Sequence, residues 1–379
     1  LVDMAMELRS GNRSILSEAL RQEMEKVLAR GEQVLLFLNR RGSYNFLLCR
    51  DCGHVPQCPH CAIPLSYHEK ELSMLCHYCG WSAPYPSPCS SCGGLNFLPM
   101  GEGTEKLEEV LGPLLPPGAG ILRLDRDSTR RPGRMEEILG AFARKEAAVL
   151  VGTQMLSKGH HFPDVTLAIV ADADLGLNLP DYRAAERTFQ LLLQSAGRAG
   201  RGEKPGSVII QTRDPGHYCW EYVRRADYQG FYERELDLRR RRRYPPFVRL
   251  ALIRISYAVD EAEGPDLVAA LGRHLRQRAR EIGVTVLGPA PAPLPFLKGR
   301  SRWHCLVKGD DWQSLRALYG AALEGMNGGA GTGGAGGKAG AESAAGGSGA
   351  GSASGKGGAG NAWRGKLRIR LDLDPVNML

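Results

Sequence analysis

Residues 49–92 have the sequence CRDCGHVPQCPHCAIPLSYHEKELSMLCHYCGWSAPYPSPCSSC, which contains four pairs of cysteines with two residues between the members of each pair. Two thiolates at this spacing can bind one metal ion from a single tight turn, and two such pairs complete a tetrahedral zinc site. Glycine follows the second cysteine of three pairs, at Gly53, Gly80 and Gly93. The stretch therefore predicts two structural zinc ions rather than a disulfide framework, which needs an oxidising compartment.

The spacing between the pairs favours a nested arrangement of ligands. Five residues separate Cys52 from Cys58, which is short for two turns to fold back on each other, whereas fourteen separate Cys61 from Cys76. One ion on the two inner pairs and one on the two outer pairs is therefore favoured, and sequential pairing is the alternative. The inner site is Cys58, Cys61, Cys76 and Cys79, and the outer site is Cys49, Cys52, Cys89 and Cys92. Eight thiolates leave no open coordination position, so both sites are expected to be structural. The histidines expected at the nearby surface are His54, His60, His68 and His77.

Length and charge set the broad class of the protein. The chain has 379 residues, enough for two domains and a small module, and 43% of them are hydrophobic. A net charge of +8 favours a polyanionic partner. No stretch is long enough to span a bilayer, and clustered cysteine pairs without a signal peptide fit a reducing, cytoplasmic location. Because the chain starts at Leu1 and not at Met, we expect it to be the tail of a longer protein.

Residues 1–48 and 94–235 alternate predicted helices with apolar strands. Continuous apolar runs such as that at residues 34–38 are typical of strands buried on both faces. The strands are predicted at residues 34–38, 120–124, 149–151, 167–171 and 207–211. The helices are predicted after a cap at Ser17, at residues 104–115, 132–146 and 182–196, and after a cap at Asp214. This order predicts an α/β, doubly wound parallel sheet that the insert at residues 49–93 interrupts.

Residues 236–379 follow a different order. The strands are predicted at residues 250–256, 284–287, 303–307 and 367–373, and the helices at 265–281 and 312–323. The order β-α-β-β-α-β predicts a ferredoxin-like α+β domain. Residues from about 327 to 361 are almost all glycine, alanine and serine, which predicts a disordered insert in this domain. A tether to a separate C-terminal peptide is the alternative.

Two segments of the predicted parallel-sheet region suit phosphate chemistry. Residues 151–165, VGTQMLSKGHHFPDV, directly follow a strand, where α/β sheets bind ligands, and Thr153 offers a hydroxyl for a phosphate oxygen. Residues 194–201, QSAGRAGR, place Arg198 and Arg201 on a tight turn from which they can stabilise charge on a transferring phosphoryl group. Either segment alone is also typical of a helix cap or a basic turn.

Together, in this order, the two segments resemble motifs V and VI of superfamily 2 helicases, which lie on the second RecA-like lobe. Residues 37–42, FLNRRG, resemble motif IV of the same lobe. Cysteine pairs inserted after this segment make the chain similar to the PriA family of replication-restart helicases. The further similar segments are GEGTE at 101–105, GTQMLSKGHHF at 152–162, YPPF at 244–247 and LDLDP at 371–375. The resemblance covers essentially the whole chain except the insert rich in glycine, alanine and serine.

The resemblance implies the C-terminal part of an ATP-dependent 3′-to-5′ DNA helicase that restarts stalled replication forks and assembles the primosome. It implies branched and single-stranded DNA, single-strand-binding protein and other primosome proteins as partners, with no membrane, and we expect a monomer. Arg198 and Arg201 become arginine fingers to the ATP γ-phosphate, and Gln194 couples nucleotide to DNA. The residues expected to contact DNA are Thr153, Gln154, Arg40 and Arg241. The nested pairing of the cysteines agrees with that of the family.

One departure from the family pattern is large. The 379 residues contain no GxxxxGK[ST] phosphate loop and no following acidic Mg²⁺ motif. In the family these parts lie on the first lobe, so ATP and Mg²⁺ are expected only together with that lobe, and this chain alone is expected to be inactive. The alternative is a zinc-bearing, DNA-binding primosome-assembly scaffold without a motor. A zinc ribbon of the transcription machinery is a third class, which the helicase-like segments disfavour.

Five consecutive arginines at residues 239–243 have two interpretations. They could contact DNA phosphates, with an affinity that falls steeply with salt. They could equally be the solvated end of a helix, where cations suit the helix dipole. Tyr244 and Phe247, which follow the run, are expected to pack rather than to stack on bases.

Overall fold

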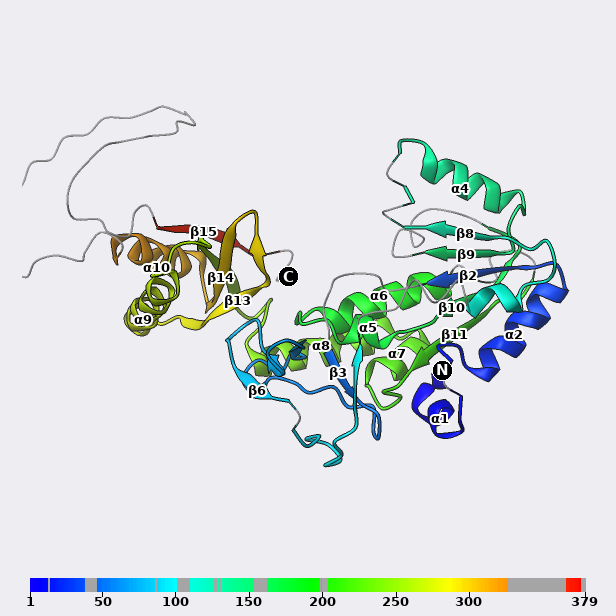
Figure 1. Ribbon diagram of the computed structural model, residues 1–379, viewed down its shortest axis with the longest axis horizontal. Helices are drawn as coiled ribbons and strands as arrows, with labels where there is room; N and C mark the ends of the chain where they lie inside the picture. The colour runs from blue at the N-terminus through cyan, green and yellow to red at the C-terminus, as the bar shows by residue number, and fades with distance from the viewer. Residues whose placement is uncertain are drawn as a thin grey trace, which may run out of the picture. The chain divides into compact units, whose positions relative to one another are not determined.

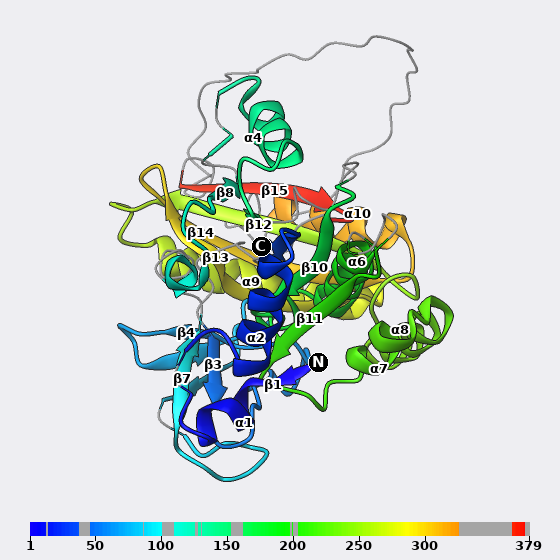
Figure 2. The same cartoon turned by 90° about the vertical axis from the view of Figure 1, so that its right-hand side faces the viewer.

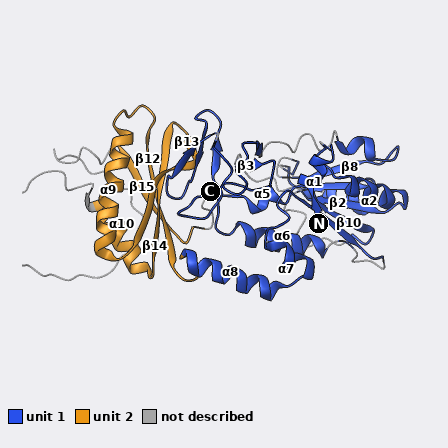
Figure 3. Cartoon of the chain, turned by 90° about the horizontal axis from the view of Figure 1, so that it is seen from below, with its two compact units in different colours: residues 1–242, 379 blue, residues 243–378 orange. Residues whose placement is uncertain are grey.

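The computed structural model describes residues 1–12, 14–37, 46–85, 87–100, 110–125, 128–129, 131–152, 162–197, 199, 204–325 and 366–375. These residues fall into two units, Leu1–Arg242 and Arg243–Met378 (Figure 3). The division follows the end of helix α8 (Tyr228–Arg242), whereas the sequence placed the second domain from residue 236. The predicted disordered insert at about 327–361 lies outside the described residues.

Six parallel strands form the sheet of the first unit, in the order β1-β11-β10-β2-β9-β8 (Figure 1). Their bounds are Val2–Asp3 (β1), Gln33–Phe37 (β2), Ile121–Leu124 (β8), Val149–Gly152 (β9), Val165–Val170 (β10) and Ser207–Thr212 (β11). The parallel sheet predicted from the alternating pattern is confirmed, and β1 is an additional strand.

Helices cover both faces of this sheet. Leu35 and Phe37 of β2 enter one apolar core, while Val34 and Leu36 enter the other. The first core includes residues of α4 (Arg134–Ala143), α5 (Asp174–Leu177), α6 (Ala184–Ala196), α7 (Cys219–Arg225) and α8, and the second includes residues of α2 (Glu18–Ala29). Burial on both faces explains why the strands are apolar without alternation.

The predicted start of the helix is confirmed for α2 and is wrong for α7. The Ser17 hydroxyl accepts the N–H of Leu20 at 3.2 Å, as a helix cap does. The cap expected at Asp214 is wrong, because α7 begins at Cys219. The Asp214 carbonyl instead accepts the indole N–H of Trp220 at 2.7 Å and closes a turn. Of the helix expected at 104–115, residues 104–109 lie outside the described residues, and a short 3-10 helix, η1 (Gly112–Leu114), follows.

The insert consists of small antiparallel sheets. Strands β3 (Phe46–Cys49) and β7 (Phe97–Met100) pair at its base. Strands β4 (Ser66–His68), β5 (Ser73–Leu75) and β6 (Ser82–Pro84) form a three-stranded sheet.

A short helix, α1 (Met4–Arg9), lies near the N-terminus of the lobe (Figure 2). Within the described residues, no helix combines the length and the apolar character needed to cross a membrane.

The second unit has an antiparallel sheet in the order β13-β14-β12-β15. The elements in chain order are β12 (Arg249–Ala258), α9 (Gly264–Ile282), β13 (Thr285–Leu297), β14 (Arg300–Gly309), α10 (Trp312–Gly325) and β15 (Leu367–Leu373). This is the predicted ferredoxin-like order. Strand β13 is longer than predicted because its proline-rich half lies on the edge of the sheet, where an amide N–H is not needed. The prolines are Pro289, Pro291, Pro293 and Pro295.

Candidate metal centres and the carboxyl edge of the sheet

The structure brings the eight paired cysteines together in two groups of four. All sulfur atoms of a group lie within 4.8 Å of one another. One group is Cys49, Cys52, Cys89 and Cys92, and the other is Cys58, Cys61, Cys76 and Cys79. The chain therefore has two four-cysteine sites, and the pairs are nested rather than sequential.

The separations between the sulfur atoms fit a shared zinc ion. Cys49 Sγ lies 3.6 Å from Cys92 Sγ, and Cys58 Sγ lies 3.6 Å from Cys79 Sγ. A tetrahedron with Zn–S bonds of about 2.3 Å has edges of about 3.8 Å, whereas a disulfide bond is about 2.05 Å long. All-thiolate coordination is the donor set of a structural zinc site, so the ions would fix the loops and perform no catalysis.

Each cysteine pair closes through one backbone hydrogen bond. The N–H of the residue after the second cysteine donates to the carbonyl of the first, at 2.8–2.9 Å. All four donors have positive φ angles, between 51° and 81°. The donors are Gly53, Ala62, Gly80 and Gly93. Only glycine adopts this conformation without strain, which explains three of the four residues and leaves Ala62 strained.

One of the nearby histidines departs from expectation. His77 was expected at the surface, but its side chain is 2% exposed and packs edge-on against His68, with ring centroids 5.3 Å apart. The four sulfur atoms beside it already complete a tetrahedral site without the imidazole.

The insert packs on the edge of the parallel sheet formed by the carboxyl ends of the strands, here called the carboxyl edge. A Cβ atom added at Gly53 would lie 1.9 Å from the carbonyl oxygen of Arg213, the residue after β11. The first turn of the outer cysteine site therefore rests directly on backbone that follows a sheet strand.

Side chains extend this contact. The buried Tyr78 hydroxyl accepts the backbone N–H of Tyr182 at 3.3 Å, just before α6. Val55 of the insert belongs to a small apolar cluster that packs against Leu175 of α5. The insert thus contacts segments that follow β10 and β11, at the edge where α/β sheets bind ligands.

The buried carboxyl group of Asp174 and the half-buried one of Asp172 hold this edge together. Asp174 accepts the Thr212 hydroxyl at 2.5 Å and the Arg213 N–H at 2.7 Å. Asp172 accepts the Arg213 guanidinium at 3.4 Å. Burial raises the pKa of Asp174 to about 7, and the charge of Asp172 adds to the increase. This network ties the end of β10 to that of β11 and thereby fixes the backbone on which Gly53 packs. It was not predicted from the sequence, although two aspartates directly after a buried strand were a usable signal.

The expected nucleotide- and DNA-contacting residues lie mostly outside the described residues. Gln194 is described and is exposed near the end of α6. Arg40 follows β2, and Thr153 and Gln154 follow β9. These two strands end side by side, because Phe37 of β2 pairs with Gly152 of β9. The residues outside the description are Arg40, Thr153, Gln154, Arg198 and Arg201.

The arginine run ends helix α8, and its members have different surroundings. Arg239 donates to Glu186 at 2.5 Å and lies over the ring of Tyr182, 5.2 Å from its centroid. Arg241 is exposed and forms an ion pair with Asp237. Arg239 therefore contributes to packing, while DNA contact by Arg241 stays a prediction.

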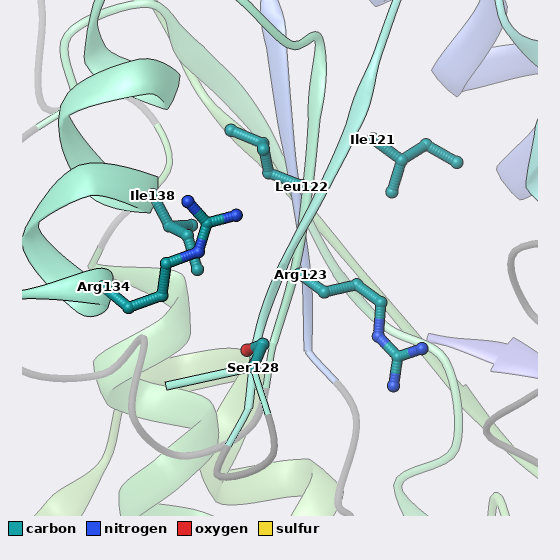
Figure 4. Close-up of a pocket in the computed structure, with 6 residues that line it drawn as sticks. All are labelled: Ile121, Leu122, Arg123, Ser128, Arg134 and Ile138. Carbon is teal, nitrogen blue, oxygen red and sulfur yellow. The ribbon is translucent and has the colours of Figure 1, made fainter. Parts of the chain in front are cut away.

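A cavity of about 400 Å³ lies between β8 and α4, as Figure 4 shows. Its polar wall groups already have partners. Arg123 pairs with Asp125 and Arg134 with Glu137, both at 2.8 Å. The lining residues are Ile121, Leu122, Arg123, Ser128, Arg134 and Ile138. We therefore assign no ligand to it.

Comparison with known proteins gives matches along most of the chain. The replication restart protein PriA of Bacillus subtilis is 44% identical over 324 residues, which cover 86% of this chain and 40% of that protein. The replication restart protein PriA of Synechocystis sp. is 43% identical over 312 residues, which cover 81% of this chain and 37% of that protein. The chain thus spans less than half the length of these relatives. A solved structure of S. cerevisiae Dbp5 bound to RNA and ADP BeF3 is 13% identical, covering 59% of this chain and 42% of that one, with a TM-score of only 0.28.

The parallel-sheet lobe and the two four-cysteine sites define a class of protein, the C-terminal lobe of a helicase with a zinc-binding insert. The family model of the helicase conserved C-terminal domain matches residues 97–203, and that of the PriA DNA helicase Cys-rich region matches residues 58–84. The family model of the primosomal protein N C-terminal domain matches residues 240–329. The chain belongs to the PriA family of replication restart proteins.

Proposed function

We propose that this chain is the C-terminal part of an ATP-dependent 3′-to-5′ DNA helicase that restarts stalled replication forks and assembles the primosome. The observation that carries the proposal is the packing of a two-site, PriA-type cysteine insert on the carboxyl edge of a helicase lobe. Ligands of α/β sheets bind at that edge. A zinc-fixed insert there can respond to DNA or nucleotide bound beside it.

In this proposal ATP and Mg²⁺ bind together with a first lobe that carries the phosphate loop. Arg198 and Arg201 stabilise negative charge on the γ-phosphate, and Gln194 couples that event to DNA. The DNA contacts come from Arg40, Thr153, Gln154 and Arg241. Because arginine fingers act on a phosphate held elsewhere, the chain alone is expected to hydrolyse no ATP.

We propose three functional parts: a lobe at residues 1–48 and 94–235, a zinc-binding insert at 49–93, and a C-terminal domain from 236 to 379. The partners are branched and single-stranded DNA, single-strand-binding protein and other primosome proteins. The protein acts as a monomer in the cytoplasm. The net charge of +8 supports a polyanionic partner.

The test uses the full-length protein from the reading frame that contains this sequence. Arg198→Ala or Arg201→Ala should lower DNA-stimulated ATP hydrolysis by about 10³-fold or more and leave DNA affinity unchanged. Arg225→Ala is the matched control, since Arg225 is exposed on α7 and pairs with Glu221. Duplexes with a 3′ single-stranded tail should be unwound in preference to those with a 5′ tail.

Two results would contradict parts of the proposal. Equal turnover in the Arg198 variant and the Arg225 control would remove the arginine-finger assignment. A wild-type protein that binds branched DNA but hydrolyses no ATP would be a primosome-assembly scaffold without a motor.

A further inference from the structure

The two four-cysteine sites differ in how far solvent reaches their cysteines. In the outer site Cys92 is exposed and Cys52 is half-buried, whereas in the inner site Cys79 is half-buried and the other three cysteines are buried. Zinc holds its cysteine ligands as thiolates, and the oxidation of a thiolate follows its exposure. The outer site is therefore the one that an oxidant in solution reaches first.

The turn that carries Cys92 offers no side chain that could cover it. Residues 89–94 have the sequence CSSCGG, in which no side chain is larger than that of cysteine. Ser90, Ser91 and Gly93 are exposed. A Cβ atom added at Gly93 would have no atom within 4 Å, so the turn borders open space on that side. The exposure of Cys92 thus follows from the sequence of its own turn.

The inner cysteines lie among buried apolar residues. Ile63 and Leu65, just after the second cysteine pair, are buried, and so is Tyr78 within the third pair. Cys79 is the least buried inner ligand, and its sulfur accepts a hydrogen bond from the N–H of Trp81 at 3.4 Å. The apolar shell of a metal site controls the access of solvent. The inner thiolates are therefore shielded from an oxidant that reaches Cys92.

A second thiolate lies within reach of Cys92. The Sγ atoms of Cys92 and Cys49 are 3.6 Å apart, and Cys49 is fully buried. The sulfur atoms of Cys52 and Cys89 form the other close pair of the site, at 3.7 Å. An accessible thiolate beside a second cysteine is the arrangement in which an oxidised cysteine is resolved as a disulfide.

We propose that Cys92 makes the outer zinc site sensitive to peroxide, while the inner site resists it. The Cys92 thiolate attacks one oxygen of hydrogen peroxide, which breaks the O–O bond, forms a sulfenic acid and releases hydroxide. The Cys49 thiolate then attacks the Cys92 sulfur, displaces a second hydroxide and forms a disulfide. The two sulfur atoms together lose two electrons, and the peroxide takes them up as it becomes two hydroxide ions. Only two of the four ligands of the outer ion remain, and the ion is released.

Loss of the outer ion opens the insert where the chain enters and leaves it. Cys49 is the last residue of β3 and pairs with Phe97 of β7, and these two strands form the base of the insert. The turn that begins at Cys49 also carries Gly53, which packs on the Arg213 carbonyl at the carboxyl edge. Oxidation therefore loosens the contact between the insert and the lobe, while the inner ion keeps the rest of the insert folded. This inference is independent of the proposed ATP hydrolysis.

The test follows zinc and disulfides in the chain loaded with two zinc ions. Hydrogen peroxide is added in small steps in the presence of a chromogenic zinc chelator, and peptide mapping by mass spectrometry locates the disulfides. One zinc ion per chain should be released before the other, together with a disulfide that joins Cys49 to Cys92. Trypsin should then cleave the insert faster than before oxidation, at a dose that leaves the inner cysteines reduced.

Two matched variants separate the sites. Cys92→His keeps a nitrogen ligand for zinc but removes the thiolate that the peroxide attacks, and Cys79→His makes the same change in the inner site. Elemental analysis first establishes how many ions each variant holds. Cys92→His should keep both ions at the dose that releases one from the wild type, whereas Cys79→His should release its outer ion as the wild type does. If a variant holds fewer than two ions, the peptide map of the wild-type chain decides alone.

Several results would overturn the inference. Release of both ions at the same dose, or a first disulfide among the inner cysteines, would show that the exposure of Cys92 does not set the order. Release of zinc from Cys92→His at the wild-type dose would remove Cys92 as the point of attack. Equal cleavage of the insert before and after loss of the outer ion would refute the loosening of its contact with the lobe.

Discussion

Gly53 touches Arg213 through backbone alone, since a Cβ atom at Gly53 would lie 1.9 Å from the Arg213 carbonyl oxygen. Gly53 closes the first turn of the outer cysteine site, and Arg213 follows β11 at the carboxyl edge. Backbone cannot rotate away as a flexible side chain can. The zinc-binding insert is therefore fixed to the lobe at a point that tolerates no added atom.

Gly53→Ala should detach the insert from the lobe. Gly93→Ala is the matched control, because Gly93 closes the corresponding turn with a similar φ angle and has no atom within 4 Å of an added Cβ. The control should be destabilised by about 1–2 kcal/mol from the left-handed conformation alone. Gly53→Ala should lower the free energy of unfolding by more than this, and proteases should cleave the insert of this variant faster than that of the control. Equal melting temperatures and cleavage rates for the two variants would contradict the backbone contact.

Cys79→Ser should remove one zinc ion and leave the other. The inner site then has three thiolates, and sites of this kind fold only with their metal. Elemental analysis should give one zinc per chain, with the outer site intact because it shares no ligand with the inner one. Cys219→Ala is the control, since burial raises the pKa of Cys219 to about 12 and keeps it a thiol away from both sites. Two zincs per chain in the Cys79 variant would refute the inner site.

The sequence was sufficient to predict features that depend on residues close together in the chain. The cysteine spacing predicted both four-residue groups, because a two-residue separation fixes how two sulfur atoms meet one ion. The Ser17 cap needs only three residues of chain. The order of apolar strands predicted the parallel sheet, since a strand covered on both faces must be apolar on both.

Interactions between distant segments could not be predicted in this way. The side chain of Gln33 donates to the carbonyls of Phe142 and Ala147, at 2.8 and 2.9 Å, more than a hundred residues away. Gln211 similarly donates to the carbonyl of Ala171 at 2.9 Å. A polar residue within an apolar strand has no visible partner in the sequence. The packing of Gly53 on residue 213 escapes prediction for the same reason, because a glycine after a cysteine pair already has a sufficient local explanation.

Glu32 should make the stability of the lobe depend on pH in the acid range. Its buried carboxylate accepts hydrogen bonds from Arg30 at 3.0 Å and Thr166 at 2.7 Å, and Lys204 lies 3.3 Å away. These contacts, with Arg30 first, lower the pKa of Glu32 from 4.5 to about 2. The unfolded chain therefore takes up a proton more readily than the folded one. The stabilisation is complete above about pH 4.5 and is lost as the pH falls through about 2.

Glu32→Gln should accordingly lower stability by about 1–3 kcal/mol at neutral pH, because it weakens hydrogen bonds to a charged group. The difference in melting temperature from the wild type should shrink steadily below about pH 4.5. Glu137→Gln is the control, since its pair with Arg134 is on the surface and contributes little at any pH. If the difference in melting temperature between Glu32→Gln and the wild type stayed constant as the pH fell to about 2, the charge on Glu32 would not be the cause of the lower stability.

Ala62→Gly should stabilise the inner cysteine site, an uncommon effect for glycine. Ala62 closes the turn of Cys58 and Cys61 with a φ angle of +51°, where the other three turns use glycine. Relief of the left-handed strain is worth about 1–2 kcal/mol, and the greater freedom of glycine in the unfolded chain costs about 0.5–1 kcal/mol, so a net gain of about 0–1.5 kcal/mol, centred at about 0.7 kcal/mol, is expected. Zinc release to a chelator should slow by the corresponding few-fold. Ala83→Gly on β6 of the same insert is the control and should be destabilising, because a strand residue has no such strain to lose. If both variants released zinc faster than the wild type, the turn at Ala62 would carry no strain that glycine relieves.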